Sequence, residues 1–375
     1  MRISSAVAFW LPQFAAFSSA TIYETRFKGV TWDNENWRIK TTELDQGHYQ
    51  SRMSLANGYF GINIAAVGPF FEIDVPVAGD NINGWPLFDR RQTFATIAGF
   101  YDSQPTTNGT NFEWLNQYGG ESVISGVPHW SGLHVQVNGH VLSATVPSSQ
   151  ISNFQSSLDV KAGLLTWKYT WTPPSAPPIG VEYSLFVHKL YVNQAAVQLK
   201  LTPSRDVAAT IIDVLDGDSA VYTTFAGKAI EKNSSTIWSS VKPTGIDDVT
   251  AYIYSTLAGD ASVDLSSRSE FSDKKYIGAN ASSIAQAVSA KLVGGKTTVV
   301  EKYVGAASSD AFAAPQAVAR KASLDGAKTG FAALLKSHSQ EWAQILTEDS
   351  VDDYSLTNGS LPSDPNLIEA QITSD

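Results

Sequence analysis

Short strand-like segments separated by two-residue turns fill most of the chain, and they restrict the folds open to it. In LHVQVNGHVLSATV, the pair Asn138-Gly139 lies between alternating apolar residues, which is the pattern of a β-hairpin whose turn needs positive φ angles. LDVKAGLLTWKYTW has the same form around Ala162-Gly163, and VSAKLVGGKTTVVEKYVGAA has it around Gly294-Gly295. The sequence therefore predicts an antiparallel hairpin at each of these turns.

The two-residue period assigns a buried face to these strands. After the Ala162-Gly163 turn, large residues alternate with polar ones and lie on one face: Leu165, Trp167, Tyr169 and Trp171. The segments AAVQLKLTP and AATIIDVLDG add further strands, so residues 21–308 form a mainly β region of antiparallel sandwich type. Hydrophobic residues make up 43% of the chain and cysteine is absent, so we expect a large core that is stable without disulfides.

After residue 308 the hydrophobic period changes from that of a strand to that of a helix. Pro315 suits the first turn of a helix that we expect to reach about Ser323 and to end at Asp325-Gly326. A second helix is predicted by one apolar stripe that must pack on something: Phe331, Leu334, Leu335, His338, Trp342, Ile345 and Leu346. Residues 348–375 are rich in Asp, Ser and Pro and form a polar tail.

Residues 1–20 have the pattern of a secretory signal peptide. Arg2 precedes the apolar run AVAFWLPQFAAF, and a small-residue exit of the kind that signal peptidases cut after ends at Ala20. The run is too short for a membrane-spanning helix, and Pro12 interrupts it. We therefore expect a secreted protein, extracellular or located in the cell wall or the vacuole. N-glycosylation sequons fit this export: those of Asn108, Asn233, Asn280 and Asn358.

The charge of the chain excludes some classes of partner. The formal net charge is −10 and no cluster of Lys or Arg occurs, so nucleic acid and anionic membrane surfaces are poor partners, whereas a neutral sugar is compatible. The sequence contains no phosphate-binding or dinucleotide fingerprint and no Gly-x-Ser-x-Gly nucleophile motif. We expect no cofactor.

Paired carboxylates are the groups that a glycosidase uses as general acid and base. Glu72 and Asp74 lie at strand spacing, which directs both side chains to one face. Because acidic side chains are mostly exposed, we interpret each close pair as solvated surface or turn residues: Glu72/Asp74, Asp247/Asp248 and Asp352/Asp353. We assign no catalytic pair within the chain.

The histidines lack the i, i+4 spacing of a helical metal site. His134 and His140 flank the Asn138-Gly139 turn and are placed to approach one another across it, but a third ligand is missing. We expect both to be exposed strand residues and predict no metal site. His338 lies on the helical stripe, where we expect a partly buried histidine whose hydrogen bonds are satisfied.

Long segments without periodicity lie between residues 80 and 130. They contain Trp85, Trp114 and Trp130 beside Asn, Gly, Asp and Arg residues, and sugar sites combine flat apolar faces with a few fixed hydrogen-bonding groups. Two interpretations stay open. These tryptophans help to form a carbohydrate site, or they anchor the segments by packing, which is the commoner use of large aromatic side chains.

Segments spread along the chain resemble, in order, the amino-terminal domain of glycoside hydrolase family 65. YQSRMSLANGYFGIN resembles the segment that begins the family's β-supersandwich, and FDRRQTFATIAGFYDSQP resembles its Arg-x-Thr-aromatic segment. VPHWSGLHVQVNG is similar to a Leu-Pro-Asn-Trp segment, with His129 where Asn is more usual. LLKSHSQEWAQIL is similar to the helix that leads from sandwich to catalytic barrel. Within the family, the segments look most like those of fungal acid trehalases.

The resemblance implies a large antiparallel β-supersandwich over residues 21–308, two linker helices over 309–347, and an (α/α)6 barrel that is absent from this chain. In the family, inverting hydrolysis takes place in that barrel. The resemblance therefore gives this chain no catalytic residue and implies that it is inactive alone, with trehalose or a related disaccharide as the substrate of the full-length enzyme. Sandwich loops in the family reach toward the barrel's pocket, which makes these residues candidates for shaping it: Trp85, Asp89, Arg90, Trp114, His129 and Trp130.

Two alternatives remain. One is a free-standing secreted carbohydrate-binding β-sandwich, which would bind glycans unaided. The other is a fragment of a family phosphorylase acting on maltose, kojibiose or trehalose, whose phosphate dependence would be decided outside these residues.

Overall fold

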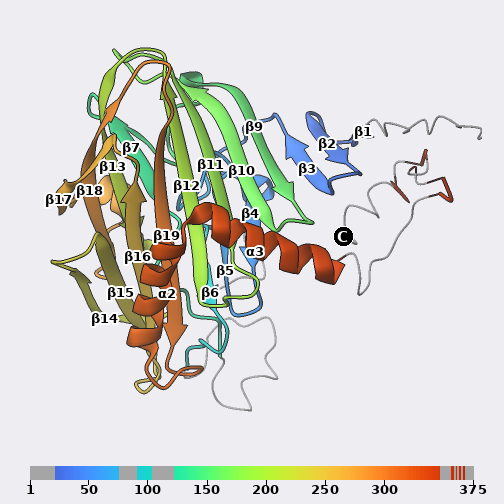
Figure 1. Ribbon diagram of the computed structural model, residues 1–375. Helices are drawn as coiled ribbons and strands as arrows, with labels where there is room; N and C mark the ends of the chain where they lie inside the picture. Colours follow the sequence, from blue (N-terminus) through green and yellow to red (C-terminus); the bar gives the residue numbers. More distant parts are fainter. Residues whose placement is uncertain are drawn as a thin grey trace, which may run out of the picture.

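The computed structural model describes residues 22–75, 91–103 and 122–346, together with residues 356–358, 360, 363–364 and 366–367. Within these residues the protein is mainly β, with antiparallel sheets and two long helices that lie against the largest sheet (Figure 1). The prediction of a mainly β, antiparallel fold with two helices after it is confirmed.

The largest sheet has 11 strands in the order β1-β2-β3-β9-β10-β11-β12-β19-β16-β15-β14. Neighbouring strands in it are antiparallel. Its strands are β1 Ile22–Glu24, β2 Val30–Asp33, β3 Arg38–Thr41, β9 Ile151–Asp159, β10 Leu164–Trp171, β11 Ile179–Val187, β12 Gln194–Pro203, β14 Thr223–Ile230, β15 Thr236–Pro243, β16 Ala251–Gly259 and β19 Thr298–Ser308.

Two smaller sheets complete the β structure. A 5-stranded sheet has the order β17-β18-β13-β7-β8, and a 3-stranded sheet has the order β4-β5-β6. Their strands are β4 Met53–Ala56, β5 Phe60–Ile64, β6 Ala95–Ile97, β7 Leu133–Val137, β8 His140–Leu142, β13 Val207–Leu215, β17 Val263–Glu270 and β18 Ile284–Leu292. A single helical turn, α1 Lys274–Ile277, precedes β18, and short 3-10 turns lie at Tyr49–Ser51, Ser148–Gln150 and Gly217–Ser219.

One large hydrophobic core lies between the sheets. The residues predicted to share a face of β10 are all at most 2% exposed and belong to this core: Leu165, Trp167, Tyr169 and Trp171. Val135 of β7 and Ile211 of β13 enter the same core from the 5-stranded sheet. The two-residue period of β10 is therefore confirmed.

Two of the predicted hairpins are confirmed, and the one at Gly294-Gly295 is wrong. Asn138 (φ 50°) and Gly139 (φ 80°) form the turn between β7 and β8, and Gly163 (φ 59°) lies in the turn between β9 and β10. Beyond Gly294-Gly295, however, β18 pairs with β13 and β17, whereas β19 pairs with β12 and β16. The turn therefore carries the chain from one sheet to the other, because distant strands supply the partners.

The turn between β4 and β5 is fastened to the sandwich by Asn57. The side-chain oxygen of Asn57 accepts hydrogen bonds from the N–H groups of Tyr59 (2.9 Å) and Phe60 (3.1 Å). Its amide nitrogen donates to the carbonyl oxygens of His188 (2.8 Å) and Val192 (3.0 Å). The same side chain therefore shapes the turn and ties it to the connection between β11 and β12.

Helix α2, Pro315–Thr329, lies across β19 and β16 (Figure 1). The prediction that it ends at Asp325-Gly326 is wrong. A Cβ at Gly326 would lie 3.2 Å from the Tyr303 ring, so this glycine serves close packing of helix on sheet and not termination. The helix ends before Gly330, whose φ of 85° is one that only glycine adopts readily.

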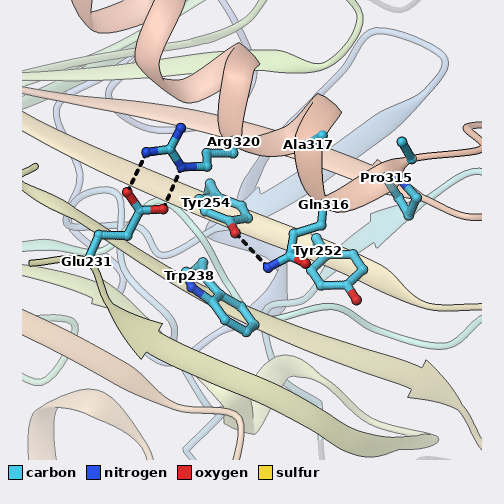
Figure 2. Close-up of a pocket in the computed structure, with 9 residues that line it drawn as sticks. Glu231, Trp238, Tyr252, Tyr254, Pro315, Gln316, Ala317 and Arg320 are labelled. Atoms are coloured by element: carbon cyan, nitrogen blue, oxygen red, sulfur yellow. Dashed lines mark hydrogen bonds and ion pairs between the residues drawn. The ribbon is translucent and has the colours of Figure 1, made fainter. Parts of the chain in front are cut away.

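Side-chain contacts fix α2 to the sheet along its length. Arg320 forms a two-point ion pair with Glu231, just after β14, with N···O distances of 2.7 and 2.9 Å (Figure 2). The Gln316 amide donates to the Tyr254 hydroxyl at 3.1 Å, and the Gln194 amide donates to the carbonyl oxygen of Ala322 at 3.0 Å. The helix is thus tied to three different parts of the sheet.

Helix α3, Phe331–Gln344, packs through the first half of its predicted stripe. Phe331, Leu334 and His338 are buried, whereas the later stripe residues Trp342, Ile345 and Leu346 are partly exposed. Within the described residues, every helix is too short or too polar to cross a membrane.

The expectation that the hydrogen bonds of His338 are satisfied is confirmed, and the residue is fully buried where partial burial was expected. Its Nδ1 accepts the N–H of Lys189 and its Nε2 donates to the carbonyl oxygen of Gly163, both at 3.0 Å. The ring stacks on Phe186 with the centroids 4.9 Å apart. Burial lowers the pKa of His338 to about 4, so the neutral imidazole joins α3 to two connections of the large sheet.

Candidate functional site

The structure describes two of the residues that the sequence places near a carbohydrate, His129 and Trp130. Both lie between β6 and β7, and neither has any exposed surface. The others lie outside the described residues: Trp85, Asp89, Arg90 and Trp114.

Trp130 packs inside the core. Its ring lies 5.4 Å from that of Phe60, measured between centroids. Its indole nitrogen has no hydrogen-bond partner among the described residues. A ring without exposed surface has no face to offer a sugar, so in this conformation Trp130 acts as a packing anchor.

His129 is held in place by a bridge to Asp216. The His129 N–H donates to the Asp216 carbonyl oxygen at 2.8 Å, and the Asp216 N–H returns a bond of 3.0 Å. The imidazole Nε2 donates to the carbonyl oxygen of Asn63 at 3.0 Å. Because burial lowers the pKa of His129 to about 3, the ring is neutral and its hydrogen bonds are structural.

A small polar pocket of about 170 Å³ lies beside His129 and is called here the His129 pocket. It is bounded by β7, by residues 71–73, by the segment after β8, and by α1. Its ionisable and hydroxyl-bearing walls include Glu72, His129, His134, Asp216, Lys275 and Tyr276.

Asp216 is the group in this pocket that titrates near neutrality. Burial raises the pKa of its carboxyl group to about 7, although Oδ1 accepts the N–H of Asp218 at 2.9 Å. A carboxylic acid that keeps its proton to such a pH has the property needed of a general acid.

The rest of the His129 pocket does not fit glycoside cleavage. That chemistry needs a second carboxyl group, with room between the two for sugar and water. Glu72 is committed elsewhere, since it accepts the Arg52 Nε–H at 3.3 Å and the Gly47 N–H at 2.9 Å. The carboxylate of Asp218, which also lines the pocket, accepts the N–H groups of Ala279 and Asn280 at 2.9 and 2.8 Å. The volume of 170 Å³ is also below the roughly 300 Å³ at which ligand pockets begin. We interpret the pocket as a structural polar cluster.

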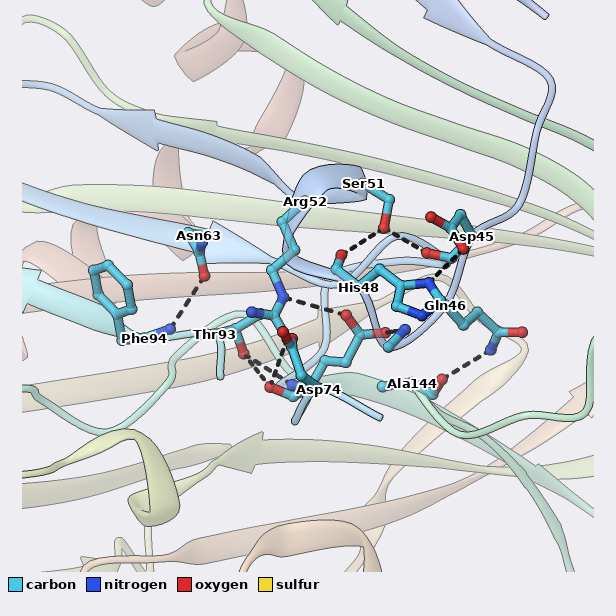
Figure 3. A network of polar contacts seen from close by, with 12 residues as sticks. Asp45, Gln46, His48, Ser51, Arg52, Asn63, Asp74, Thr93, Phe94 and Ala144 are labelled. Carbon is cyan, nitrogen blue, oxygen red and sulfur yellow. Dashed lines mark hydrogen bonds and ion pairs between the residues drawn. The ribbon is translucent and has the colours of Figure 1, made fainter. Parts of the chain in front are cut away.

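Arg52 lies at the centre of the neighbouring polar network (Figure 3). Its guanidinium group pairs with the carboxylates of Glu72 and Asp74, and the side chains of Arg52 and Glu72 are only 2% and 3% exposed. The interpretation of Glu72 as a solvated residue is therefore wrong. Burial raises the pKa of Glu72, while the Gly47 N–H and the Arg52 charge act in the opposite direction.

The Arg52 network holds the chain on both sides of residues 76–90, the segment that contains three of the candidate residues. The Asp74 N–H donates to the carbonyl oxygen of Arg91 at 2.9 Å, and Ile73 and Gln92 form a β-bridge. Arg52 is thus a buried centre of ion pairing that the sequence did not reveal. The strand spacing of Glu72 and Asp74 correctly put both acids on one face, but nothing local pointed to an arginine 20 residues away as their partner.

The ends of the segment 104–121, which contains Trp114, are held in a similar way. Asp102 and Val123 exchange two bonds: the Val123 N–H donates to the Asp102 carboxylate at 2.7 Å, and the Asp102 N–H donates to the Val123 carbonyl oxygen at 2.9 Å. Asp102 is 1% exposed. The described residues that flank the two segments therefore include buried polar anchors, Arg52 with Glu72 for the first and Asp102 for the second.

The other sequence interpretations have mixed outcomes. His134 is buried and not exposed: it stacks on Phe70 at 4.7 Å, and its Nδ1 donates to the carbonyl oxygen of Leu142 at 3.1 Å. His140 is exposed as expected, and it pairs across the hairpin with Val137, not with His134. Asp247/Asp248 are exposed, and Asp352/Asp353 lie outside the described residues.

The architecture is that of an antiparallel β-supersandwich domain with helices after it. It is similar to a solved structure described as "Putative kojibiose phosphorylase from human microbiome", with a TM-score of 0.62 and 14% identity, over 84% of this chain and 38% of that one. At this identity the likeness shows the fold alone. Residues 39–345 match the model of "Glycosyl hydrolase family 65, N-terminal domain", and the chain belongs to that family, as the ordered segments of the sequence indicated.

Curated relatives share much higher identity. A cell wall acid trehalase of Arthroderma benhamiae is 56% identical over 355 residues, which are 94% of this chain and 33% of the relative. An acid trehalase of Emericella nidulans is 53% identical over 357 residues, which are 94% of this chain and 34% of the relative. The chain thus spans about one third of the length of these relatives.

Proposed function

We propose that this chain is the amino-terminal, non-catalytic part of an extracellular acid trehalase, which hydrolyses α,α-trehalose to glucose by an inverting acid/base mechanism. The observation that carries the proposal is the identity of 56% and 53% with acid trehalases across 94% of the chain. The likeness to a phosphorylase supports only the fold, so it does not favour phosphorolysis.

Two observations support a non-catalytic role for these residues. The family model that matches them is that of the N-terminal domain. Among the described residues, the buried carboxyl groups of the His129 pocket lack the space and the free partner that glycoside cleavage needs. The general acid and base then belong to other residues of the full-length enzyme.

The proposed role of the sandwich is to support the active site without forming it. The Arg52 and Asp102 anchors fix the ends of the two segments in which most of the candidate pocket residues occur. The partly exposed Trp342, Ile345 and Leu346 at the end of α3 offer apolar surface to the catalytic barrel. In this proposal Trp85, Asp89, Arg90 and Trp114 reach the substrate pocket, and His129 and Trp130 brace the loops from inside.

A domain exchange tests this function. Residues 39–345 replace the matching segment of the Arthroderma benhamiae acid trehalase, and glucose release from trehalose is measured at acid pH. We expect the hybrid to keep most of the parent activity, because the two domains are 56% identical. A hybrid carrying the sandwich of the kojibiose phosphorylase is the control and is expected to be inactive. A well-folded first hybrid without activity would contradict the assignment to trehalase.

The non-catalytic role has its own test. The chain alone is incubated with trehalose, and glucose is measured beside matched Asp216→Asn and Glu72→Gln variants. We expect no turnover from any of the three. Turnover that disappears in one of the variants would show that this chain carries catalytic carboxylates.

Export belongs to the same proposal. Relatives are described as cell wall, periplasmic or secreted acid trehalases, which supports an extracellular location. We propose residues 1–20 as the signal peptide, 21–308 as the sandwich, 309–347 as the linker helices and 348–375 as a polar tail.

Among the described sequons, the asparagines Asn233, Asn280 and Asn358 are exposed. Endoglycosidase treatment lowers the mass of a glycosylated chain. An asparagine-to-glutamine variant that loses part of this mass change identifies an asparagine that carries a glycan.

A further inference from the structure

A groove of about 540 Å³ lies apart from the His129 pocket, where the first turns of α2 meet β15 and β16 (Figure 2). One wall is formed by α2 residues from Pro315 to Arg320. The other is formed by aromatic side chains on the sheet, with Glu231, just after β14, closing one side. None of the candidate site residues named from the sequence lines this groove.

The aromatic wall is made of three neighbouring rings. Tyr252 and Tyr254 lie two residues apart on β16 and so share a face, and Trp238 on β15 is the direct cross-strand partner of Tyr254. The Trp238 ring stacks on Tyr254 with centroids 5.8 Å apart and planes at 20°, and lies 6.1 Å from Tyr252. Tyr254 is buried, whereas Trp238 and Tyr252 are partly exposed. The groove therefore exposes the flat rings of Trp238 and Tyr252, and the buried Tyr254 packs beneath Trp238.

Polar groups border these rings. Arg320 and Glu231 pair at 2.7 and 2.9 Å, and the Gln316 side chain, which is exposed, donates to the Tyr254 hydroxyl at 3.1 Å. Because Arg320 lowers the pKa of Glu231, both members of the pair are charged near neutrality and their charges cancel. A ligand thus meets donors and acceptors without a net charge.

We propose that this groove binds a short neutral oligosaccharide, of two or three hexose units. Pyranose rings have an apolar C–H face that can lie on Trp238 and Tyr252, and hydroxyl groups at their edges that can bond to Glu231, Arg320 and Gln316. A charged ligand would meet no uncompensated charge, because Glu231 and Arg320 neutralise each other. A purely apolar ligand would leave the polar groups at the border of the groove without hydrogen-bond partners. The volume of 540 Å³ lies in the range of about 300–1,000 Å³ typical of small-molecule sites.

This site is distinct from the proposed function and does not rest on it. Among the described residues that line it, Glu231 has no second carboxyl group opposite it, so the site binds without cleaving. The outcome of a binding experiment is therefore independent of whether the full-length enzyme hydrolyses trehalose.

Titration of the whole chain tests the site. Maltotriose, laminaritriose, cellotriose and trehalose are added separately, and binding is followed by calorimetry and by tryptophan fluorescence. We expect at least one of these sugars to bind, and Trp238→Ala to weaken its binding about tenfold or more through loss of the stacking surface. Tyr252→Ala, at a partly exposed position, gives a second variant that keeps the Trp238–Tyr254 stack, and it is expected to weaken binding as well.

Phe27→Ala is the matched control. Phe27 is a 58% exposed aromatic residue in the turn between β1 and β2, at the opposite edge of the 11-stranded sheet. Its loss should leave binding unchanged. The proposal is overturned if none of the sugars binds the native chain, if folded Trp238→Ala and Tyr252→Ala bind like the native chain, or if Phe27→Ala weakens binding as much as they do.

Discussion

The ammonium group of Lys302 lies 2.8 Å from the Asp213 carboxylate, and neither side chain has any exposed surface. Lys302 belongs to β19 of the 11-stranded sheet and Asp213 to β13 of the 5-stranded sheet, so the pair crosses the core. Ser255 and Gln286 also donate to this carboxylate at 2.8 Å, and Lys302 donates to two backbone carbonyl oxygens at 2.7 and 3.0 Å. The charges are therefore both paired and hydrogen-bonded.

Breaking this pair should be costly because the remaining charge stays buried. We expect Lys302→Met to lower the free energy of unfolding by about 3–5 kcal/mol, measured by denaturant titration. Lys168→Met is the control, since Lys168 pairs with Glu182 at a side-chain exposure of 68% and should change stability by about 1 kcal/mol or less. A loss for Lys302→Met no larger than the control's would contradict this account.

Arg52 supports a prediction about local opening. Replacement by Met leaves the carboxylates of Glu72 and Asp74 without their cation, which should loosen the strand pairing next to them. We expect faster hydrogen exchange at the amides of Asp74 and Thr93, which bond to Arg91 and Glu72. Exchange at β10 amides, deep in the core, provides the internal reference. Equal exchange at Asp74 in both proteins would show that Arg52 does not fix this part of the chain.

Asp216 should make the protein more stable as the pH falls from neutrality. The folded pKa is about 7, whereas an exposed aspartate has a pKa of 3.8, so between these values the folded state binds a proton that the unfolded state does not. The free energy of unfolding contributed by Asp216 then rises by up to about 1.4 kcal/mol per pH unit on acidification, and is lost as the pH rises through 7. We expect Asp216→Asn to remove this contribution, and the exposed Asp247→Asn to leave it. Identical pH profiles for Asp216→Asn and the native chain would contradict the shift.

His338 should act in the opposite direction. Its folded pKa is about 4 and its unfolded value is 6.5, so its contribution is complete above 6.5 and is lost as the pH falls toward 4. We expect His338→Gln to flatten the dependence of Tm on pH in this window, even if it lowers Tm overall. His140→Gln, at an exposed position, should keep the native slope. An unchanged slope for His338→Gln would mean that its pKa is not lowered.

The parts of the fold that could be predicted are those coded by neighbouring residues. Asn138-Gly139 and Ala162-Gly163 carry their turn geometry and their flanking strand pattern together, so both hairpins were found. Gly294-Gly295 has the same local signature, but the strands on its two sides pair with other strands, β18 with β13 and β17 and β19 with β12 and β16, which no turn motif encodes. Gly326 was misread as a helix end because its reason for being glycine, contact with Tyr303, is tertiary.

For the candidate sites too, the features encoded by neighbouring residues could be predicted, and the features that depend on distant residues could not. The pairing of Tyr252 and Tyr254 on one face is visible in AYIYS, but the groove also needs Trp238 from another strand and a wall from α2. Glu72 was misjudged because the exposure of an acid depends on its counter-ion, here Arg52, and not on its neighbours in sequence. His338 was predicted correctly because a histidine within an apolar stripe is buried by the same period that buries the stripe.

The position of β19 in the large sheet determines when that sheet can finish pairing during synthesis. Among the described residues it is the last strand in sequence, yet it lies within the large sheet, between β12 and β16. Until residue 308 has left the ribosome, the sheet exists as two halves, each with an unpaired edge able to join another chain. Nascent chains of this domain therefore pass through a period of aggregation risk that ends only when β19 has paired, and a chaperone that covers strand edges would matter most in that interval.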